Sequence, residues 1–214
     1  MTHTTPEAHP ADRAELGAMG STLAAAFAGD PVWEWLLPSG RNTMSRAAPI
    51  FEWIVAGHLI DRSVWTLPGY EATAVWAPPG RHRTPLAAVV RALPRLLRSL
   101  GPAGFGRFAS LGAMEKMHPS EPHWYLALLG THPDHQGQGL GTAVVTPGIA
   151  AADAEGVGCY LESSKEANVP YYQRLGFEVI GTYDVDRGLG PRLWLMWRDP
   201  TPPSGRTEPP TAAQ

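Results

Sequence analysis

The feature that most constrains this chain is an apolar strand that leads through a glycine-rich turn into a helix. Residues His123–Gly130 are apolar throughout their centre, which predicts a strand buried on both faces. The turn Gln136–Gly141 (Gln-Gly-Gln-Gly-Leu-Gly) follows, with a helix predicted from about Gly139 to Ala154. Glycines permit positive φ, and a helix start offers unpaired N–H groups with about half a positive charge. The sequence therefore predicts an anion site, suited to a phosphate, at this turn.

The glycine spacing separates this turn from two other phosphate-binding loops. A Walker loop ends in Gly-Lys-Ser/Thr, whereas Gly141-Thr142 has no lysine between its residues. A dinucleotide fingerprint is G-x-G-x-x-G in an early βαβ unit, whereas the pattern here is G-x-G-x-G and falls late in the chain. Taken alone, the turn is also compatible with a tight strand-to-helix connection that binds nothing.

The remaining elements predict an α/β or α+β mixed sheet with helices packed on it. Further strands are predicted at Ser63–Leu67, Thr73–Trp76, Cys159–Ser163, Phe177–Tyr183 and Arg192–Trp197. Further helices are predicted at Ala11–Ala28, Met44–Leu59, Pro85–Leu100 and Val169–Leu175. Gly29-Asp30-Pro31 is expected to break the first helix, and the glycine-rich stretch from Gly101 to His118 indicates no clear structure.

Length and composition indicate one domain at residues 11–198, with disordered ends at 1–10 and in the proline-rich tail 199–214. The chain has 214 residues, 43% of them apolar, and lacks the run of roughly 20 apolar residues that a membrane span needs. A net charge of −3 without a basic stripe argues against nucleic acid as a partner. The single Cys159 and the polar N-terminus predict a cytoplasmic protein.

Two ordered motifs, about 30 residues apart, resemble those of a known family. Gln136–Gly141 resembles the Gln/Arg-x-x-Gly-x-Gly/Ala motif of the GCN5-related N-acetyltransferase (GNAT) superfamily, and Asn168–Phe177 resembles its Asn…Tyr…Gly-Phe signature. Within that superfamily, Glu121–Arg198 is similar to puromycin N-acetyltransferases, notably at Pro133–Gly137 and Arg174–Phe177. The resemblance implies a mostly antiparallel sheet that splays at the cofactor strand. It assigns acceptor binding to residues 11–120 and acetyl-CoA binding to residues 121–198.

The resemblance also implies which residues bind the cosubstrate. The end of the strand, at Leu129, Gly130 and Thr131, would pair with the pantetheine arm, and an N–H near Leu129 would stabilise the oxyanion. Asn168 has two candidate roles, as the cap of the helix that begins at Val169 or as a pantetheine contact. Backbone amides that would bind the pyrophosphate belong to Gln136, Gly137, Gln138, Gly139, Leu140, Gly141 and Thr142.

Acid–base chemistry is assigned to two side chains. Tyr172 stands where the family places its general acid, and Tyr171 is the rival; neighbours on a helix point about 100° apart, so one of the two is expected to face the thioester. Glu162 interrupts an apolar strand and is the first candidate for the base that deprotonates the amine. A merely hydrogen-bonded or outward-facing carboxylate at Glu162, a base at Asp30 or Glu34, and deprotonation through water are the alternatives.

The acceptor site is expected in the first half of the chain. Of its five tryptophans, most are expected in the core, and Trp76 is assigned to the acceptor pocket with Asp30 and Glu34, which would attract a charged amine. The resemblance points to a small-molecule primary amine, an antibiotic such as a puromycin-like aminonucleoside being one candidate. A peptide amine and a non-catalytic acetyl-CoA sensor are alternatives. No metal is expected, since His132 and His135 lack partner ligands in the sequence, and a monomer or homodimer is expected.

Overall fold

One seven-stranded sheet forms the centre of the protein, in the strand order β1-β2-β3-β4-β5-β7-β6. The structure is a computed structural model that describes residues 6–37 and 43–201. The strands are β1 (His9–Pro10), β2 (Val64–Thr66), β3 (Ala72–Ala77), β4 (His123–Thr131), β5 (Gly158–Ser163), β6 (Glu178–Asp184) and β7 (Arg192–Arg198). The helices are α1 (Leu16–Ala26), α2 (Pro31–Leu36), α3 (Thr43–His58), α4 (Leu86–Leu111), α5 (Leu140–Glu155) and α6 (Val169–Arg174).

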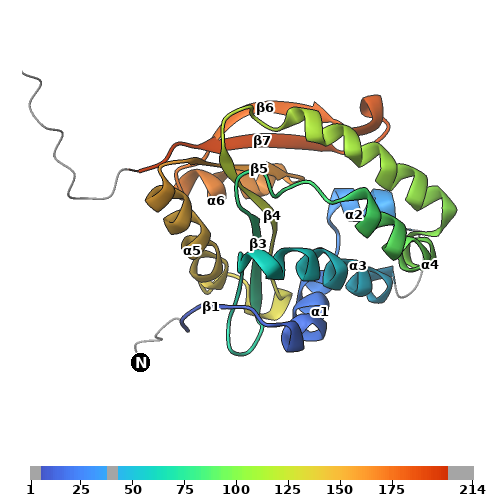
Figure 1. The fold of residues 1–214 in the computed structure, drawn as a ribbon, viewed down its shortest axis with the longest axis horizontal. Coiled ribbons are helices and arrows are strands. Elements are labelled where there is room, and N and C mark those ends of the chain that lie inside the picture. Colours follow the sequence, from blue (N-terminus) through green and yellow to red (C-terminus); the bar gives the residue numbers. More distant parts are fainter. Residues whose placement is uncertain (1–5, 38–42, 202–214) are drawn as a thin grey trace, which may run out of the picture.

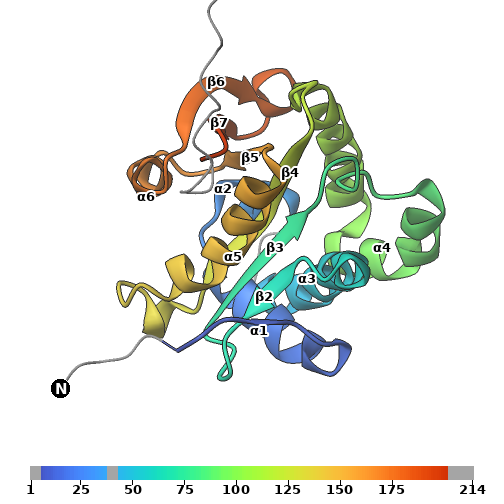
Figure 2. The same ribbon diagram turned by 60° about the vertical axis from the view of Figure 1, so that its left-hand side comes forward.

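Helices cover both faces of the sheet (Figure 1 and Figure 2). On one face, α1, α3 and α4 pack in a cluster that includes Phe51, Leu96 and Val75 of β3. On the other face, α5 packs in a cluster that includes Val144 and Trp76. Successive residues of a strand point to opposite faces, so Val75 and Trp76 belong to different clusters. The predicted mixed sheet with helices on it is confirmed.

The sheet opens between β4 and β5, which form its one parallel pair among the described strands. These two strands pair only from His123–Tyr125 to Gly158–Tyr160. Beyond that point β4 stays paired with β3 as far as Thr131, while β5 pairs with β7. The register shift opposite Val75 leaves Ala127 as an extra residue in β4. The expected splay of a mostly antiparallel sheet is therefore present at β4.

Two helical segments differ from the sequence-based expectation. Gly29–Pro31 does end α1, but α2 follows at once because Asp30 Oδ1 accepts from the N–H groups of Val32 at 3.0 Å and Trp33 at 3.3 Å. The ambiguous stretch after Leu100 continues α4 to Leu111, with one break at Gly101, whose φ is 68°. No helix in the described ranges is both long and apolar enough to cross a membrane.

Disorder was the expectation at both ends, and it is wrong for the residues nearest the domain. His9 and Pro10 form β1, which pairs with β2. After β7, the N–H of Thr201 donates to Asp153 Oδ1 at 2.7 Å, and Trp197 Nε1 donates to Asp199 Oδ1 at 2.7 Å. These hydrogen bonds hold Thr201 against α5 and Asp199 against β7. The rest of the two predicted segments, at 1–5 and 202–214, lies outside the described residues.

Candidate active site

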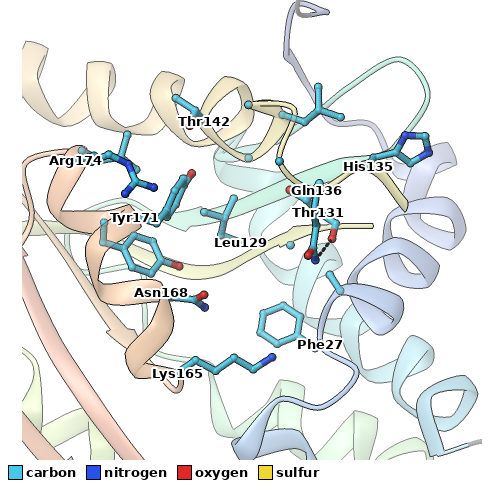
Figure 3. Close-up of a pocket in the computed structure, with 18 of the residues that line it drawn as sticks. Phe27, Leu129, Thr131, His135, Gln136, Thr142, Lys165, Asn168, Tyr171 and Arg174 are labelled. Atoms are coloured by element: carbon cyan, nitrogen blue, oxygen red, sulfur yellow. Dashed lines mark hydrogen bonds between the residues drawn. The ribbon is translucent and has the colours of Figure 1, made fainter. Parts of the chain in front are cut away.

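A cavity of about 690 Å³ lies where β4 and β5 separate, between the start of α5 and α6 (Figure 3). Most of the residues predicted to bind the cosubstrate meet there, although they come from three separate elements. Of that set, only Gln138 is not among the lining residues. The predicted residues that line the cavity are Asp30, Leu129, Gly130, Thr131, Gln136, Gly137, Gly139, Leu140, Gly141, Thr142, Asn168 and Tyr172.

The glycine turn forms one wall of this cavity. Gly137 and Gly139 have φ of 76° and 79°, a conformation that side chains disfavour. Gln136 Nε2 donates to the carbonyl of Thr131 at 3.2 Å and so ties the turn to the end of β4. The helix α5 begins at Leu140, which leaves the amides of its first turn free to bind an acceptor. The wall therefore presents N–H groups and the positive end of a 16-residue helix.

The tyrosines of α6 form the opposite wall, and both line the cavity. Lining the cavity does not decide which of the two faces the thioester, so that expectation stays a prediction. An added Cβ on Gly141 would stand 3.3 Å from the hydroxyl of Tyr171, so Tyr171 points to the start of α5. Tyr172 instead packs edge-on against Phe177, with 6.1 Å between ring centroids. Burial raises the pKa of Tyr172, and the charges of Tyr171 and Asp30 raise it further, so this phenol stays protonated near neutral pH.

Asn168 and Gly176 set the ends of α6. The side chain of Asn168 caps none of the described amides of α6, so the capping role is wrong, and Asn168 lines the cavity instead. Gly176 has φ of 89° and follows the helix, and the N–H of Phe177 donates to the carbonyl of Tyr172 at 3.1 Å. Phe177 is buried as a result, which confirms the predicted helix stop with Phe177 folded onto the core.

Glu162 lies on β5, two residues beyond the last pair with β4, and its side chain is only 4% exposed. Burial raises its pKa to about 7, although the phenols of Tyr125 and Tyr160 beside it act in the opposite direction. Glu162 Oε1 makes no hydrogen bond to any described residue, and it lies 3.6 Å from His118 Nε2. The alternative of an outward-facing carboxylate is therefore wrong, whereas a carboxylate that is merely hydrogen-bonded by the neighbouring phenols stays an alternative. Glu162 does not line the 690 Å³ cavity, but Lys165, two residues beyond the end of β5, does.

The three residues assigned to the acceptor have different surroundings. Asp30 is 3% exposed and lines the cavity, and its Oδ2 accepts from the hydroxyl of Ser164. Glu34 is exposed on α2 and is not among the lining residues. Trp76 is fully buried in the α5 cluster, where a methyl group on Gly148 would collide with its ring. The assignment of Trp76 to the pocket is wrong, because its place in β3 turns it to the face that α5 covers.

Several residues that line the cavity were not predicted from the sequence. Lys165 and Arg174 bring positive charge to the cavity, and Phe27 adds an aromatic face toward which the side chain of Lys165 extends (Figure 3). Lys165 and Arg174 flank the Asn168–Tyr172 motif in the sequence, and this closeness was the one signal that could have predicted their place in the cavity. His135 also lines the cavity, so at least one of the two histidines beside the turn faces it.

A second polar cluster lies at the start of β4, next to Glu162. His82, His118 and His123 stack there, with ring centroids 4.4 Å apart for His82 and His118 and 5.3 Å apart for His118 and His123. Burial, together with the neighbouring imidazoles of His82 and His123, lowers the pKa of His118 to about 4. Burial also lowers the pKa of His123. Both rings are therefore neutral near pH 7.

Comparison with known proteins bears on the family. Residues 74–177 match the model of the acetyltransferase (GNAT) family. An uncharacterized N-acetyltransferase of Schizosaccharomyces pombe is 29% identical over 168 residues, which cover 73% of this chain and 68% of that protein. Mycothiol acetyltransferase of Streptomyces coelicolor is 37% identical over 89 residues, which cover 40% of this chain and 25% of that protein.

Solved structures share the fold. A Corynebacterium glutamicum protein, described as histone acetyltransferase HPA2 and related acetyltransferase, has a TM-score of 0.69 and 26% identity, over 94% of this chain and 99% of its own. An agmatine N-acetyltransferase has a TM-score of 0.62 over 92% of this chain and 100% of its own; at 13% identity it supports the fold alone. Residues 74–177 therefore match the acetyltransferase (GNAT) family, and the relatives and the shared fold agree with that match in indicating an N-acetyltransferase.

Proposed function

We propose that this protein transfers an acetyl group from acetyl-CoA to a primary amine of a small molecule. The observation that carries the proposal is the single cavity at the opening of the sheet, where the glycine turn, the free edge of β4 and the tyrosines of α6 meet. Each of these three features suits a different part of the two substrates.

The cavity walls fit the parts of acetyl-CoA. The amides of Leu140, Gly141 and Thr142 at the start of α5 suit its pyrophosphate, and Lys165 and Arg174 add positive charge. No described atom outside the turn lies within 4 Å of a Cβ built on Gly137 or Gly139, which leaves room for a ligand close to the backbone. The edge of β4 beyond Tyr125 lacks a strand partner, and the amides of the pantetheine arm suit that edge. Bound there, acetyl-CoA supplies an activated acyl thioester.

The residues around the opening can then assist the transfer. The amine attacks the thioester carbonyl, a C–N bond forms, and the C–S bond breaks. A backbone N–H near Leu129 donates to the carbonyl oxygen as it gains negative charge. Glu162 accepts the proton that the amine loses, and Tyr172 donates a proton to the departing sulfur. The buried carboxylate oxygen of Glu162, which lacks a described hydrogen-bond partner, supports its role as the base.

The acceptor side supports a small amine. The helix α4 covers this side of the sheet. It packs so tightly on α2 that a methyl group on Gly104 would collide with the carbonyl of Leu36. Phe27 and Asp30 form the adjacent cavity wall, an aromatic face beside a carboxylate. A puromycin-like aminonucleoside is one acceptor of this type, and its acetylation would protect the cell from an antibiotic. That choice rests on the resemblance over Glu121–Arg198.

A peptide amine is the second candidate acceptor. It is favoured by the name of the 26%-identical Corynebacterium protein, which refers to histone acetyltransferase. We infer action in the cytoplasm, because Cys159 is buried and free of a disulfide. A monomer or homodimer stays the expected assembly.

A screen for CoA release tests the proposal. Wild-type protein is supplied with acetyl-CoA and with aminonucleosides, aminoglycosides, polyamines, amino acids or a lysine-containing peptide. We expect release with a small amine and none with the peptide. CoA release with the peptide and with no small amine would refute a small-molecule acceptor and support the peptide amine. CoA binding without release for any amine would indicate a sensor, and failure to bind CoA would refute both readings.

Glu162→Gln tests the assigned base in the same assay. General-base catalysis is worth roughly 10²–10⁴-fold, so we expect kcat to fall by about 10²-fold or more while the affinity for CoA stays unchanged. Glu178→Gln is the matched control, because Glu178 is exposed on β6, away from the cavity, and should leave kcat unchanged. An unaltered kcat in Glu162→Gln would show that deprotonation proceeds through water.

A further inference from the structure

We propose that His82, His118 and His123 form a binding site for a divalent transition-metal ion, with Zn²⁺ as the preferred occupant. These residues lie in three segments: the loop after β3, the end of the 3-10 helix at Gly112–Met117, and the first position of β4. One nitrogen of each histidine lies within 4.8 Å of the corresponding nitrogen of the other two. The sequence did not predict this site, because the three segments meet only in the folded protein.

The spacing of these nitrogens suits a small tetrahedral ion. A Zn²⁺ ion with bonds of about 2.0–2.1 Å holds its ligand nitrogens roughly 3.4 Å apart. His118 Nδ1 and His123 Nε2 already lie 3.1 Å apart. The ring of His82 is stacked on that of His118, at an interplanar angle of 14°, so at least one of these two rings must rotate when the ion binds. Three histidines would leave a fourth position for water, as in many zinc sites.

The outward nitrogens of His82 and His123 lie within hydrogen-bond distance of oxygen acceptors, the usual outer shell of a metal-binding histidine, and that of His118 lies near a carboxylate. His82 Nε2 lies 2.9 Å from Glu115 Oε1, and His123 Nδ1 lies 2.7 Å from the carbonyl of Glu121. His118 Nε2 lies 3.6 Å from Glu162 Oε1. If each of these nitrogens carries the proton, the lone pairs of His82 Nδ1, His118 Nδ1 and His123 Nε2 remain for an ion.

The inner nitrogen of His82 separates a metal site from ordinary packing. Three stacked rings joined by hydrogen bonds would form a stable polar cluster by themselves. In this cluster, however, His82 Nδ1 is buried and has no hydrogen-bond partner among the described residues. An unsatisfied buried nitrogen costs roughly 1–3 kcal/mol, and a metal ion bound to it would remove that cost.

The surroundings also suit a cation. The carboxylates of Glu115 and Glu162 lie next to the histidines, and Arg83 neutralises only part of this charge through its bond to Glu115 at 2.6 Å. An entry path is present, because His82 also lines a second cavity of about 330 Å³ between α3 and the loop before α4. An ion reaching the cluster by this path would join the three segments that carry its ligands.

Metal titration of the full-length protein tests the proposal. Protein freed of metal with a chelator is titrated with Zn²⁺ against a chromophoric chelator, and with Co²⁺ to record the visible spectrum of the bound ion. We expect one ion per chain and the spectrum of a tetrahedral site. Glu115→Gln should weaken Zn²⁺ binding by roughly 10- to 100-fold, because it removes the negative charge of the outer partner of His82. Zn²⁺ should also raise the melting temperature of the wild type.

Variants of the ligands complete the test. His118→Asn and His82→Asn should each abolish stoichiometric Zn²⁺ binding, and circular dichroism reports whether each variant is folded. His9→Gln is the matched control, because His9 lies on β1 at the edge of the sheet, and it should bind Zn²⁺ like the wild type. Absence of a stoichiometric ion in the wild type, or binding that survives in folded His118→Asn and His82→Asn, would overturn the proposal. The readout is ion binding, so the result is independent of acetyl transfer.

Discussion

Gly141 offers a direct test of the proposed phosphate wall, because a methyl group added there should impair ligand binding without impairing the fold. Gly141 is the second residue of α5 and does not have a positive φ. A Cβ at this position would stand 3.2 Å from Thr131 Oγ1 and 3.3 Å from the hydroxyl of Tyr171. Both neighbours line the cavity, so the methyl group would lie between the helix start and the opposite wall.

Opposite effects are expected on stability and on binding. Alanine is better than glycine in a helix by roughly 0.8–1 kcal/mol, and the tight contacts offset part of that gain, so the free energy of unfolding should change little. Binding should suffer because the methyl group keeps the pyrophosphate from the amides of the first turn. Loss of two charge-assisted hydrogen bonds, each worth about 1.5 kcal/mol, would weaken CoA binding by roughly 10²-fold.

Gly156→Ala is the matched control at the other end of the same helix. Gly156 has φ of 69°, and a Cβ built on it would have no described atom within 4 Å apart from its chain neighbours. Alanine there therefore carries only the backbone cost of a positive φ, about 1–2 kcal/mol. Its melting temperature should fall by roughly 2–8 °C while its affinity for CoA remains that of the wild type. Calorimetric titration with CoA and thermal denaturation measure both quantities. Wild-type CoA affinity in Gly141→Ala would refute the assignment of the phosphate to this helix start.

Two further substitutions test other parts of the structure. Tyr172→Phe should lower kcat by about 10²-fold with little change in CoA affinity, whereas Tyr171→Phe should leave kcat nearly unchanged. Steady-state assays measure both, and equal kcat values for the two variants would contradict Tyr172 as the general acid. Asp153→Asn should lower the free energy of unfolding by about 1–2 kcal/mol at pH 7, because it weakens the bonds that Asp153 accepts from Arg198 at 2.7 and 3.0 Å. Burial raises the pKa of Asp153, but the bonds from Arg198 and from the N–H of Thr201 outweigh burial and lower it. This stabilisation is therefore present above the unfolded-state pKa of about 3.9 and is lost as the pH falls through the lower folded-state pKa. Urea unfolding should show a smaller difference in the free energy of unfolding between the wild type and Asp153→Asn at pH 3 than at pH 7.

The C-terminal half of the chain could be predicted because its signals are local. The strand, the glycine turn and the helix at 123–155 are contiguous, and the turn needs glycine at Gly137 and Gly139 for reasons of φ alone. The stop at Gly176 is readable for the same reason. Where a local signal was ambiguous, prediction was incomplete: Gly101 indicated no structure, yet helical residues continue on both sides of it.

The N-terminal half depends on register and tertiary contacts, which a single sequence does not specify. Trp76 was assigned to the pocket as an aromatic residue, but a shift of one position in β3 decides which face it occupies. Asp30 was foreseen as a turn residue and as an acceptor ligand; it caps α2 and also lines the cavity. The histidine cluster could not be foreseen, because His82 and His118 are 36 positions apart and become neighbours only through packing.

The open edge of β4 sharpens what the glycine turn alone implied. An isolated helix start favours any phosphate, so it does not distinguish a nucleotide from CoA. Buried backbone groups nearly always find hydrogen-bond partners, yet β4 loses its strand partner on one side after Tyr125 while its other side stays paired as far as Thr131. A ligand that satisfies this edge needs amide groups as well as phosphates, and a plain nucleotide has no such chain. The combination of a helix start and an unpaired strand edge in one cavity therefore favours an extended amide-bearing cosubstrate over a nucleotide.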